Sequence, residues 1–270
     1  MAEGTVVGSV DELWRFPVKS MQGERLQQAE LTDRGLVGDR SYGLIDVATG
    51  KAASAKNLQD FPGLLGLKAT FVEEPQAGGE PPAVRIELPD GMAVTSDSGD
   101  ADRVLSAWFK RDVRLGRAAA VPATPRRGRA DIEGLVSADS LLDAFPVSLI
   151  TTSTLFRLCE LQPGSRFDPR RFRMNLVLGT REPGFLENGW VGRALGVGEG
   201  LRLDVTMLDP RCVMTTLPQD DLPEDAGILR TLTQHNRHQV ADLGRLPCAG
   251  VYAVVTTPGT VRVGDRVELG

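Results

Sequence analysis

The sequence predicts a mixed α+β protein that is rich in β-strands, with barrel-like sheets and a few helices. Short stretches of weakly alternating apolar and polar residues recur along the chain, and turn residues separate them. Few stretches show the apolar spacing of a helix. Short apolar runs near the C-terminus, at 258–267, are punctuated by Pro-Gly and Gly-Asp turns, which is typical of the closing strands of a barrel.

The first half of the chain is predicted to consist mainly of strands. Pro89-Asp90-Gly91 is a strong hairpin signal, because Asp-Gly supplies the positive φ angles of tight hairpins. One helix is predicted at 100–109, where apolar residues recur at helical spacing. The predicted strands of this half are 6–16, 26–31, 41–47, 64–72 and 83–88.

The pattern lapses into Ala, Pro, Arg and Gly between 118 and 140, which indicates a linker. We therefore predict one domain over 1–117 and a second over 118–270. In the second domain Thr152 or Ser153 is expected to cap a helix that ends near 161. A further helix is predicted at 228–235, and strands are predicted at 146–151, 172–178, 200–208 and 251–256.

Charge and hydropathy exclude several classes of protein. The 270 residues carry a net charge of −5 and a pI near 5.2, which argues against broad nucleic-acid binding. No stretch approaches the roughly 20 apolar residues of a membrane span. The N-terminus lacks the basic start and apolar core of a signal peptide. We therefore expect a cytoplasmic protein without a membrane partner.

The cysteines and histidines do not form a metal site of their own. Cys159, Cys212 and Cys248 make no CxxC pair and no even disulfide framework, so a reducing compartment fits best. An iron–sulfur cluster usually takes four ligands, almost always thiolates, and is excluded by this count. His235 and His238 lie three residues apart and are interpreted as a solvated helix end.

The segment 208–216, Leu-Asp-Pro-Arg-Cys-Val-Met-Thr-Thr, is the strongest candidate for chemistry. Cys212 follows a strand-like run and stands next to Arg211, and a neighbouring guanidinium favours the thiolate that attacks electrophiles or binds soft metals. The alternative is a buried cysteine that packs as a small hydrophobic residue.

Three more pieces supply hydrogen-bond donors. Trp-Arg-Phe-Pro-Val-Lys-Ser ends in Lys19 and Ser20, and a glycine-punctuated turn delivers Arg40. In Arg-Phe-Arg-Met-Asn, alternation along a strand would send Arg173 and Asn175 to the same side. Such a donor set suits an anionic ligand, since arginine holds phosphate through paired N–H groups. Each piece alone could equally be a strand end, a turn ion pair or an exposed strand residue.

Arginines gather at 126–129 and at 166–173, in a protein that is acidic overall. Local clusters of this kind suit a small anionic ligand better than a polyanion. Surface salt bridges are the alternative, and for the first cluster they are the preferred interpretation.

The four motifs, PVKS, GDR, FRxN and RC followed by TT, resemble in this order the MOSC family, named for the C-terminal domain of molybdenum cofactor sulfurase. The resemblance covers about 6–269, and its first half looks like the β-barrel domain that accompanies the MOSC domain. Within the family the chain resembles the mitochondrial amidoxime-reducing components and their bacterial relatives. The resemblance therefore implies an N-terminal MOSC β-barrel domain packed on a MOSC β-barrel domain.

The resemblance also implies roles for residues. Cys212 corresponds to the protein thiolate on molybdenum. The residues expected to hold the phosphorylated pterin are Lys19, Ser20, Arg40, Arg173 and Asn175, and Arg211 is expected to assist them. Ala144 and Phe145 stand where the amidoxime reducers carry Thr-Ser, so a hydroxyl contact is expected to be lost there. Pyridoxal phosphate binding is a further property associated with the family.

The implied function is a molybdenum-cofactor oxidoreductase that removes oxygen from N-hydroxylated compounds. Because the chain has no cluster or flavin motif, it would need a separate electron donor, such as a ferredoxin, a cytochrome or a flavoprotein. Two alternatives stay open: a sulfur carrier that uses a Cys212 persulfide, and a non-catalytic module that binds the cofactor. A Cys–His hydrolase is less favoured, because nothing in the sequence brings a histidine to Cys212.

Overall fold

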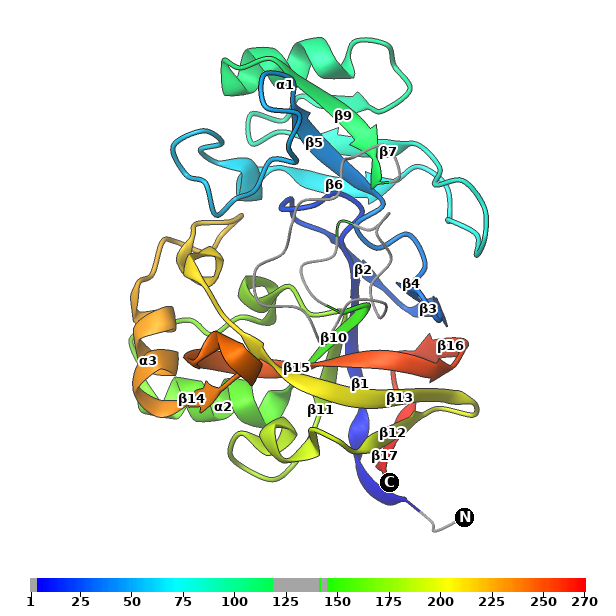
Figure 1. The fold of residues 1–270 in the computed structure, drawn as a ribbon, viewed down its shortest axis with the longest axis vertical. Coiled ribbons are helices and arrows are strands. Elements are labelled where there is room, and N and C mark those ends of the chain that lie inside the picture. Colours follow the sequence, from blue (N-terminus) through cyan, green and yellow to red (C-terminus); the bar gives the residue numbers. More distant parts are fainter. Residues whose placement is uncertain (1–3, 119–140, 142–144) are drawn as a thin grey trace.

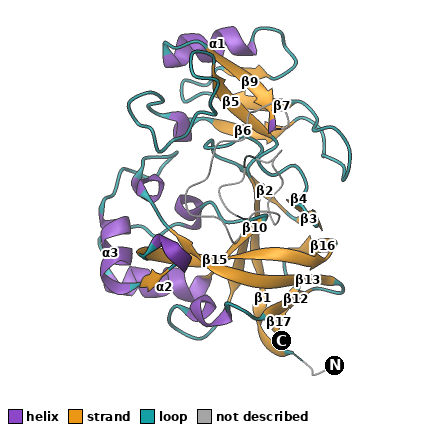
Figure 2. Ribbon diagram, in the orientation of Figure 1, coloured by secondary structure: helices purple, strands orange, loops and turns teal. Residues whose placement is uncertain are grey.

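The structure is a computed structural model that describes residues 4–118, 141 and 145–270. The described part contains three α-helices and many short strands, which confirms the predicted strand-rich α+β class. Figure 1 shows a barrel in the lower part of the molecule and a group of smaller sheets above it. Figure 2 shows that two of the helices lie on one side of the barrel and that α1 (Ala101–Phe109) lies at the opposite end of the molecule.

The predicted barrel is confirmed, and it is closed by seven strands. Six of the seven neighbouring pairs are antiparallel and one, β10 with β11, is parallel. The first strand of the chain belongs to this barrel, because Thr5 pairs with Leu269 and Leu13 pairs with Leu176. In order, the strands are β10 (Val147–Thr151), β11 (Leu176–Gly179), β1 (Thr5–Arg15), β17 (Arg266–Leu269), β12 (Ala194–Val197), β13 (Leu201–Pro210) and β15 (Arg245–Thr257), which pairs back to β10.

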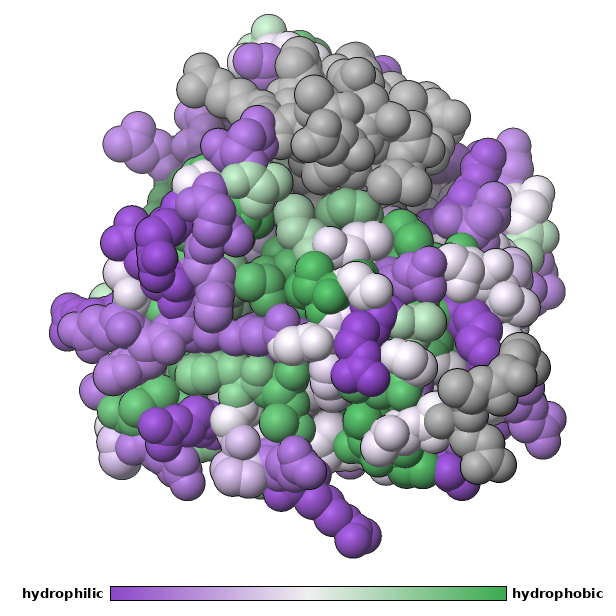
Figure 3. Space-filling view, turned by 60° about the horizontal axis from the view of Figure 1, so that its bottom comes forward, coloured by the Kyte–Doolittle hydropathy of each residue, from purple (hydrophilic) through white to green (hydrophobic). Residues whose placement is uncertain are grey.

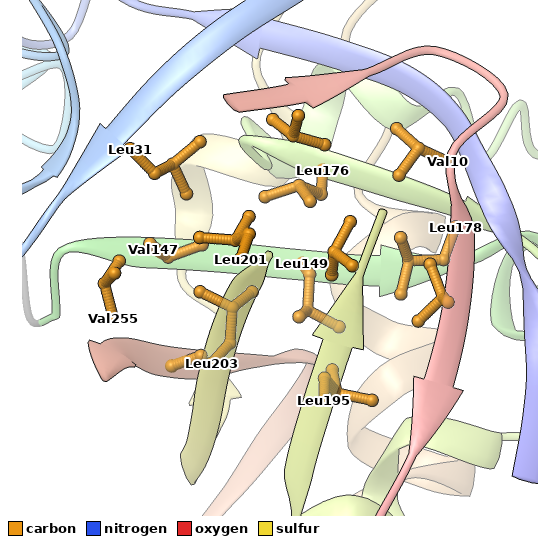
Figure 4. Packing of buried hydrophobic residues seen from close by; sticks show 14 of the residues in the cluster. Val10, Leu31, Val147, Leu149, Leu176, Leu178, Leu195, Leu201, Leu203 and Val255 are labelled. Atoms are coloured by element: carbon orange, nitrogen blue, oxygen red, sulfur yellow. The ribbon is translucent and has the colours of Figure 1, made fainter. Parts of the chain in front are cut away.

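Alternation along the strands fills the barrel with aliphatic side chains. Val147 and Leu149 of β10 point into the core, whereas Ile150 packs on the outside. Leucines and valines from different strands meet in the interior, as Figure 4 shows for Leu176, Leu203 and their neighbours. Each fully buried side chain of this kind contributes about 1.5–3 kcal/mol. The barrel interior is therefore a packed core.

Helices α2 (Thr152–Leu161) and α3 (Gly227–His235) cover the outer face of the barrel beside β10 and β15. Leu158 and Ile228 belong to one cluster with Ile150, so the helices bury the outward residues of the strands. Thr151 caps α2, since its Oγ1 accepts a hydrogen bond from the Thr154 amide at 3.2 Å. The prediction that Thr152 or Ser153 caps this helix was wrong by one or two residues, because the helix begins immediately at the strand end.

The smaller sheets form a second body, which we call the N-terminal unit and which has its own core. It includes α1 and the strands β5 (Tyr42–Asp46), β6 (Lys68–Phe71), β7 (Val84–Glu87), β8 (Ala93–Thr95) and β9 (Val113–Arg117). Met214 and Leu217, which follow β13, also pack into this core. The remaining strands are β2 (Glu24–Leu26), β3 (Gln28–Thr32), β4 (Gly35–Leu36), β14 (Arg237–Gln239) and β16 (Gly259–Arg262).

The predicted strand over 172–178 is the main local error. A 3₁₀ helix covers Pro169–Phe172, and β11 begins at Leu176. Asp168 caps this helix and Pro169 occupies its first turn, where a proline is compatible with the helical backbone. Arg173 then ends the helix in the left-handed conformation, so strand alternation does not orient it. The predicted linker lies outside the described residues except at its first residue, and the division at 117/118 stays a prediction.

The surface at the barrel end of the molecule is mixed in hydropathy. Figure 3 shows the barrel end of the molecule, where hydrophobic residues are interspersed among hydrophilic ones. Among the described residues, no helix has both the length and the hydropathy to cross a bilayer.

Glu187, in a 3₁₀ helix beside α2, provides a test of the packing. Its side chain is fully buried, and its Oε2 accepts hydrogen bonds from the hydroxyls of Thr151 at 2.6 Å and Thr154 at 2.7 Å. Burial raises the pKa of this carboxyl above its ordinary value, although the hydroxyl bonds oppose the shift. The free energy of unfolding gained from a carboxyl with a raised pKa is present below the unfolded-state pKa and is lost as the pH rises through the folded-state pKa.

We therefore expect Glu187→Gln to flatten the fall of stability with rising pH. The free energy of unfolding of the variant should rise relative to that of the natural protein as the pH increases above about 4.5, the ordinary pKa of glutamate. Urea unfolding at several pH values measures this difference. Glu199→Gln, at an exposed position, is the control and should leave the pH dependence unchanged. A pH dependence that is the same in Glu187→Gln and the natural protein would contradict the prediction.

Candidate functional site

One cavity lies where the barrel meets the N-terminal unit. The N-terminal half of the chain supplies Arg40 and Lys56. The barrel side supplies Phe145, Ser148, Arg171, Phe172, Arg173, Asn175, Asp209, Pro210, Arg211, Cys212, Met214, Thr215 and Tyr252. Arg40, Arg173, Asn175, Arg211 and Cys212, which the sequence singled out, all line this cavity. Segments that are more than 130 residues apart in the chain therefore meet at one place, as at many ligand sites between domains.

Cys212 stands at the end of β13, immediately before a short 3₁₀ helix, Val213–Thr216. Its carbonyl accepts hydrogen bonds from the amide (3.2 Å) and the hydroxyl (3.0 Å) of Thr215. Its side chain is half-buried and lines the cavity, whereas Cys159 is exposed on α2. Burial and the carboxylate of Asp209 raise the pKa of the Cys248 thiol to about 12, so Cys248 stays a neutral thiol. Cys212 is thus the cysteine that a cavity ligand can reach.

Arg40 and Arg173 are held on the same aromatic ring. The guanidinium carbons lie 5.0 Å and 4.3 Å from the ring centroid of Phe16, within the range of a cation–π contact. Arg40 forms an ion pair with the buried carboxylate of Asp39, and its Nη2 donates to the carbonyl of Arg173 at 3.4 Å. Arg173 donates to the carbonyl of Met21. The two cations are therefore fixed in place before any ligand arrives.

Three of the predicted site residues have a positive φ, which is uncommon outside glycine. The φ angles are 64° at Ser20, 51° at Arg40 and 55° at Arg173. Residues in this region are strained by about 1–3 kcal/mol each and persist where the surrounding contacts enforce them, often at functional sites. At Arg40 and Arg173 those contacts are the Phe16 ring and the carbonyl oxygens described above.

Lys19 and Ser20 lie beside the cavity without lining it. The backbone of 16–19 pairs with that of 40–42, through Arg40 N to Phe16 O at 2.7 Å and Lys19 N to Tyr42 O at 2.8 Å. The ammonium group of Lys19 donates to the carbonyl of Leu141 at 2.9 Å, and Ser20 is buried. The structure thus brings both residues near Arg40 but directs the Lys19 side chain to a main-chain carbonyl.

Asn175 connects three strands at the cavity end of the barrel. Its Oδ1 accepts hydrogen bonds from both the amide and the hydroxyl of Ser148, each at 3.1 Å. Its Nδ2 donates to the carbonyl of Trp14 at 3.4 Å, and its backbone bonds to the same two residues. The buried amide of Asn175 is thus satisfied by neighbouring strands. Ser148 was not predicted, because a lone serine in an apolar strand gives no signal.

Arg211 pairs with the buried carboxylate of Asp209 and donates to the carbonyl of Phe172. Its guanidinium carbon lies 5.6 Å from the centroid of the Phe172 ring. In the second arginine cluster, Arg166 and Arg170 form ion pairs with aspartates, whereas Arg171 and Arg173 line the cavity. The first arginine cluster, 126–129, lies outside the described residues.

The charge of the lining decides what the cavity can bind. Its described residues include five basic side chains and one carboxylate, although the chain carries a net charge of −5. Such a local excess of positive charge attracts a small anion. The paired N–H groups of the arginines suit an anionic group, and the cysteine that lines the same cavity suits a soft metal with open coordination positions. One ligand that combines such a group and such a metal would use both. The donor set therefore fits a phosphorylated ligand with a thiolate-bound metal.

Two other observations concern residues named from the sequence. Phe145 lines the cavity and stacks obliquely on Tyr252, with ring centroids 5.7 Å apart, so an apolar wall replaces a hydroxyl there. Ala144 lies outside the described residues. His235 is exposed, and His238 hydrogen-bonds to Asn236 at 2.7 Å. In the described ranges no group of three His, Cys, Asp or Glu side chains has the arrangement of a metal site.

The aromatic platform under the two arginines gives a testable expectation. Phe16→Leu should weaken phosphate binding to the protein by roughly 2–30-fold, because a cation–π contact is worth roughly 0.5–2 kcal/mol. Isothermal calorimetry with inorganic phosphate measures the effect. Phe167→Leu, which removes an equally buried ring from the cluster under α2, is the matched control. Equal losses in both variants would assign the effect to general destabilisation.

Comparisons with known proteins agree with the motif resemblance. The MOSC N-terminal beta barrel domain matches residues 7–108, and the MOSC domain matches residues 137–268. Mitochondrial amidoxime-reducing component 1 of Mus musculus is 26% identical over 290 residues, covering 97% of this chain and 82% of that protein. Mitochondrial amidoxime reducing component 2 of Rattus norvegicus is 25% identical over 289 residues, covering 97% and 83%.

Among solved structures, the YUAD protein from Bacillus subtilis superposes with a TM-score of 0.47 at 12% identity, over 97% of this chain and 94% of that one. The two domain matches follow one another along the chain and together span most of it. The chain therefore belongs to the MOSC family, with a MOSC N-terminal β-barrel domain followed by a MOSC domain.

Proposed function

We propose that this protein is a molybdenum-cofactor-dependent oxidoreductase that removes oxygen from N-hydroxylated compounds. The observation that carries the proposal is the meeting of Cys212 with the arginines of both halves of the chain in one cavity. Family membership and relatives named amidoxime-reducing components support the same class of chemistry. In the net reaction the N–O bond breaks, and the oxygen leaves as water with two electrons and two protons from outside the chain.

The residues present fit a phosphorylated pterin that carries molybdenum. Arg40 and Arg173 would hold its phosphate through their N–H groups, since both are fixed beside the cavity. Cys212 would be the protein ligand of the metal, with Arg211 next to it. Asn175 would support these contacts from the cavity wall, and Lys19 and Ser20 would support them from beside the cavity. When bound, the cofactor supplies two-electron oxygen-transfer chemistry that no side chain has.

The residues of the chain orient the groups around Cys212 and enclose the cavity. Asp209 is buried and holds Arg211, so the positive charge next to the Cys212 sulfur is fixed. Phe145 and Met214 are buried walls of the cavity, and they would keep water from the reacting oxygen. With three cysteines and no motif for a cluster or a flavin, the chain would receive electrons from a separate protein, such as a ferredoxin, a cytochrome or a flavoprotein.

Metal and pterin analysis tests the proposal. The protein should be expressed with molybdate and assayed for molybdenum by mass spectrometry and for pterin by fluorescence. We expect near-stoichiometric contents of both, together with reduction of an amidoxime by a reduced artificial donor. Absence of molybdenum and pterin from an active protein would exclude this function.

A sulfur carrier is the second candidate, because Cys212 is half-buried beside cations that would also stabilise a persulfide anion. Incubation with a cysteine desulfurase and cysteine, followed by mass spectrometry, would detect a persulfide on Cys212. A persulfide in metal-free protein that transfers its sulfur would favour this function. Tight cofactor binding without turnover under any donor would instead indicate a non-catalytic binding module.

A further inference from the structure

We propose that Arg171 is a positioning residue, which fixes the loop that carries Cys212. We call residues 212–217 the Cys212 loop. The proposal deepens the function proposed above, in which the Cys212 sulfur must be held at a defined place. Arg171 belongs to the arginine cluster that the sequence associated with an anionic ligand, but its contacts assign it a different task from that of Arg173.

The guanidinium of Arg171 donates hydrogen bonds to main-chain carbonyls. Arg171 is 1% exposed. Its Nη1 donates to the carbonyls of Thr215 and Leu217, each at 3.3 Å, and its Nη2 donates to that of Pro223 at 2.8 Å. Its Nε donates to the carbonyl of Arg166 at 3.0 Å. All three nitrogens thus bind backbone, and three of the four bonds reach the Cys212 loop or the segment that follows it.

A short path leads from these bonds to the sulfur. The Thr215 carbonyl accepts from Arg171, while the Thr215 amide and hydroxyl donate to the Cys212 carbonyl at 3.2 and 3.0 Å. On the other side of the loop, Met214 and Leu217 pack into the core of the N-terminal unit. The loop is therefore held between an apolar contact on one side and the Arg171 fork on the other.

The neighbouring arginines lack this arrangement. Arg170 forms ion pairs with Asp168 and Asp221, both at 2.8 Å, at the protein surface. Burying the charge of Arg171 costs free energy and lowers its pKa, and the carbonyl dipoles offset this cost. Only a planar fork with five donors can serve three separated carbonyls at once, and a lysine ammonium cannot span them.

The three cysteines of the chain report separately on the loop, the surface and the core. Cys159 is exposed, Cys212 lies on the loop, and Cys248 is buried in β15. The full-length protein, from cells unable to make molybdopterin, is treated with iodoacetamide, and the alkylation rate of each cysteine is followed by mass spectrometry. We expect Arg171→Met to raise the rate at Cys212 relative to Cys159 by at least about threefold, because local opening exposes a half-buried thiol.

The variants separate loop movement from unfolding. Arg157→Met, which removes an exposed arginine paired with Glu160, should leave all three rates unchanged. An unchanged Cys212 rate in Arg171→Met would overturn the proposal. If Cys248 reacts in parallel with Cys212 in Arg171→Met, the whole fold has opened, and Arg171→Lys is the deciding variant. In Arg171→Lys, Cys212 must react faster than in the natural protein while Cys248 stays protected. Any other result in that variant overturns the proposal. Since no cofactor takes part, the result does not depend on whether the protein reduces N-hydroxylated compounds.

Discussion

Cys212→Ser is expected to abolish the reduction of N-hydroxylated substrates while leaving the fold intact. A serine hydroxyl is a poor ligand for a soft metal, because it is not ionised near neutral pH and lacks the polarisable sulfur. Loss of the ligand should lower kcat at least as much as loss of an outer partner of a metal site, which costs about 10–100-fold. Stability should change by less than about 1 kcal/mol, since the side chain is half-buried and the substitution is small.

The measurement is steady-state reduction of an amidoxime by a reduced artificial donor, with molybdenum and pterin contents determined on the same samples. Cys159→Ser is the control, because that cysteine is exposed on α2 and away from the cavity. We expect the pterin to be partly retained in Cys212→Ser, because Arg40 and Arg173 are unchanged. Full activity in Cys212→Ser would contradict the assignment of the sulfur to the metal.

The fold could be predicted where short-range signals determine it. The Gly-Asp turn before β17 indicated a closing strand of the barrel, although β16 before the turn pairs with β3 in a separate sheet. Helices α1 and α3 follow their apolar periodicity within a residue or two. The incorporation of β1 into the barrel could not be predicted, since it depends on pairing between Thr5 and Leu269. Neither segment alone contains a signal that says which distant strand it pairs with, or in which register.

The candidate site shows the same limit. The residue types that meet in the cavity could be named from motifs, because arginine, asparagine and cysteine carry recognisable chemistry. Their conformations could not be predicted. The left-handed backbone of Arg173 depends on the 3₁₀ helix that begins at Pro169. It also depends on contacts of the side chain with the distant Phe16 ring and Met21 carbonyl. Ser148 could not be predicted for a related reason, because its role depends on the hydrogen bond to Asn175 in the neighbouring segment.

Asn175→Ala is expected to lower the free energy of unfolding by about 2–4 kcal/mol, because each buried donor left without an acceptor costs about 1–3 kcal/mol. Asn175 is 1% exposed and accepts hydrogen bonds from the amide and the hydroxyl of Ser148. Its Nδ2 also joins this pair to Trp14 in β1. The substitution therefore loosens β10, β11 and β1 at the end of the barrel where the cavity lies.

Urea unfolding followed by circular dichroism measures this loss, and Asn57→Ala, at an exposed position with hydrogen bonds to Asp60, is the control. Ser148→Ala removes one of the two donors, so a double-mutant cycle isolates the side-chain interaction. Residues in one hydrogen-bond network couple by about 0.5–3 kcal/mol, and additive losses in the cycle would show that they do not interact.

The cycle also separates two roles of Asn175. If its amide acts on the cofactor only by holding the strands, then Ser148→Ala, which leaves Asn175 in place, should lower pterin content in proportion to its loss of stability. If the amide touches the pterin directly, Asn175→Ala should lower the pterin content well beyond that proportion. Because Oδ1 is already occupied by Ser148, a direct contact would have to come from Nδ2, which has a second hydrogen to donate.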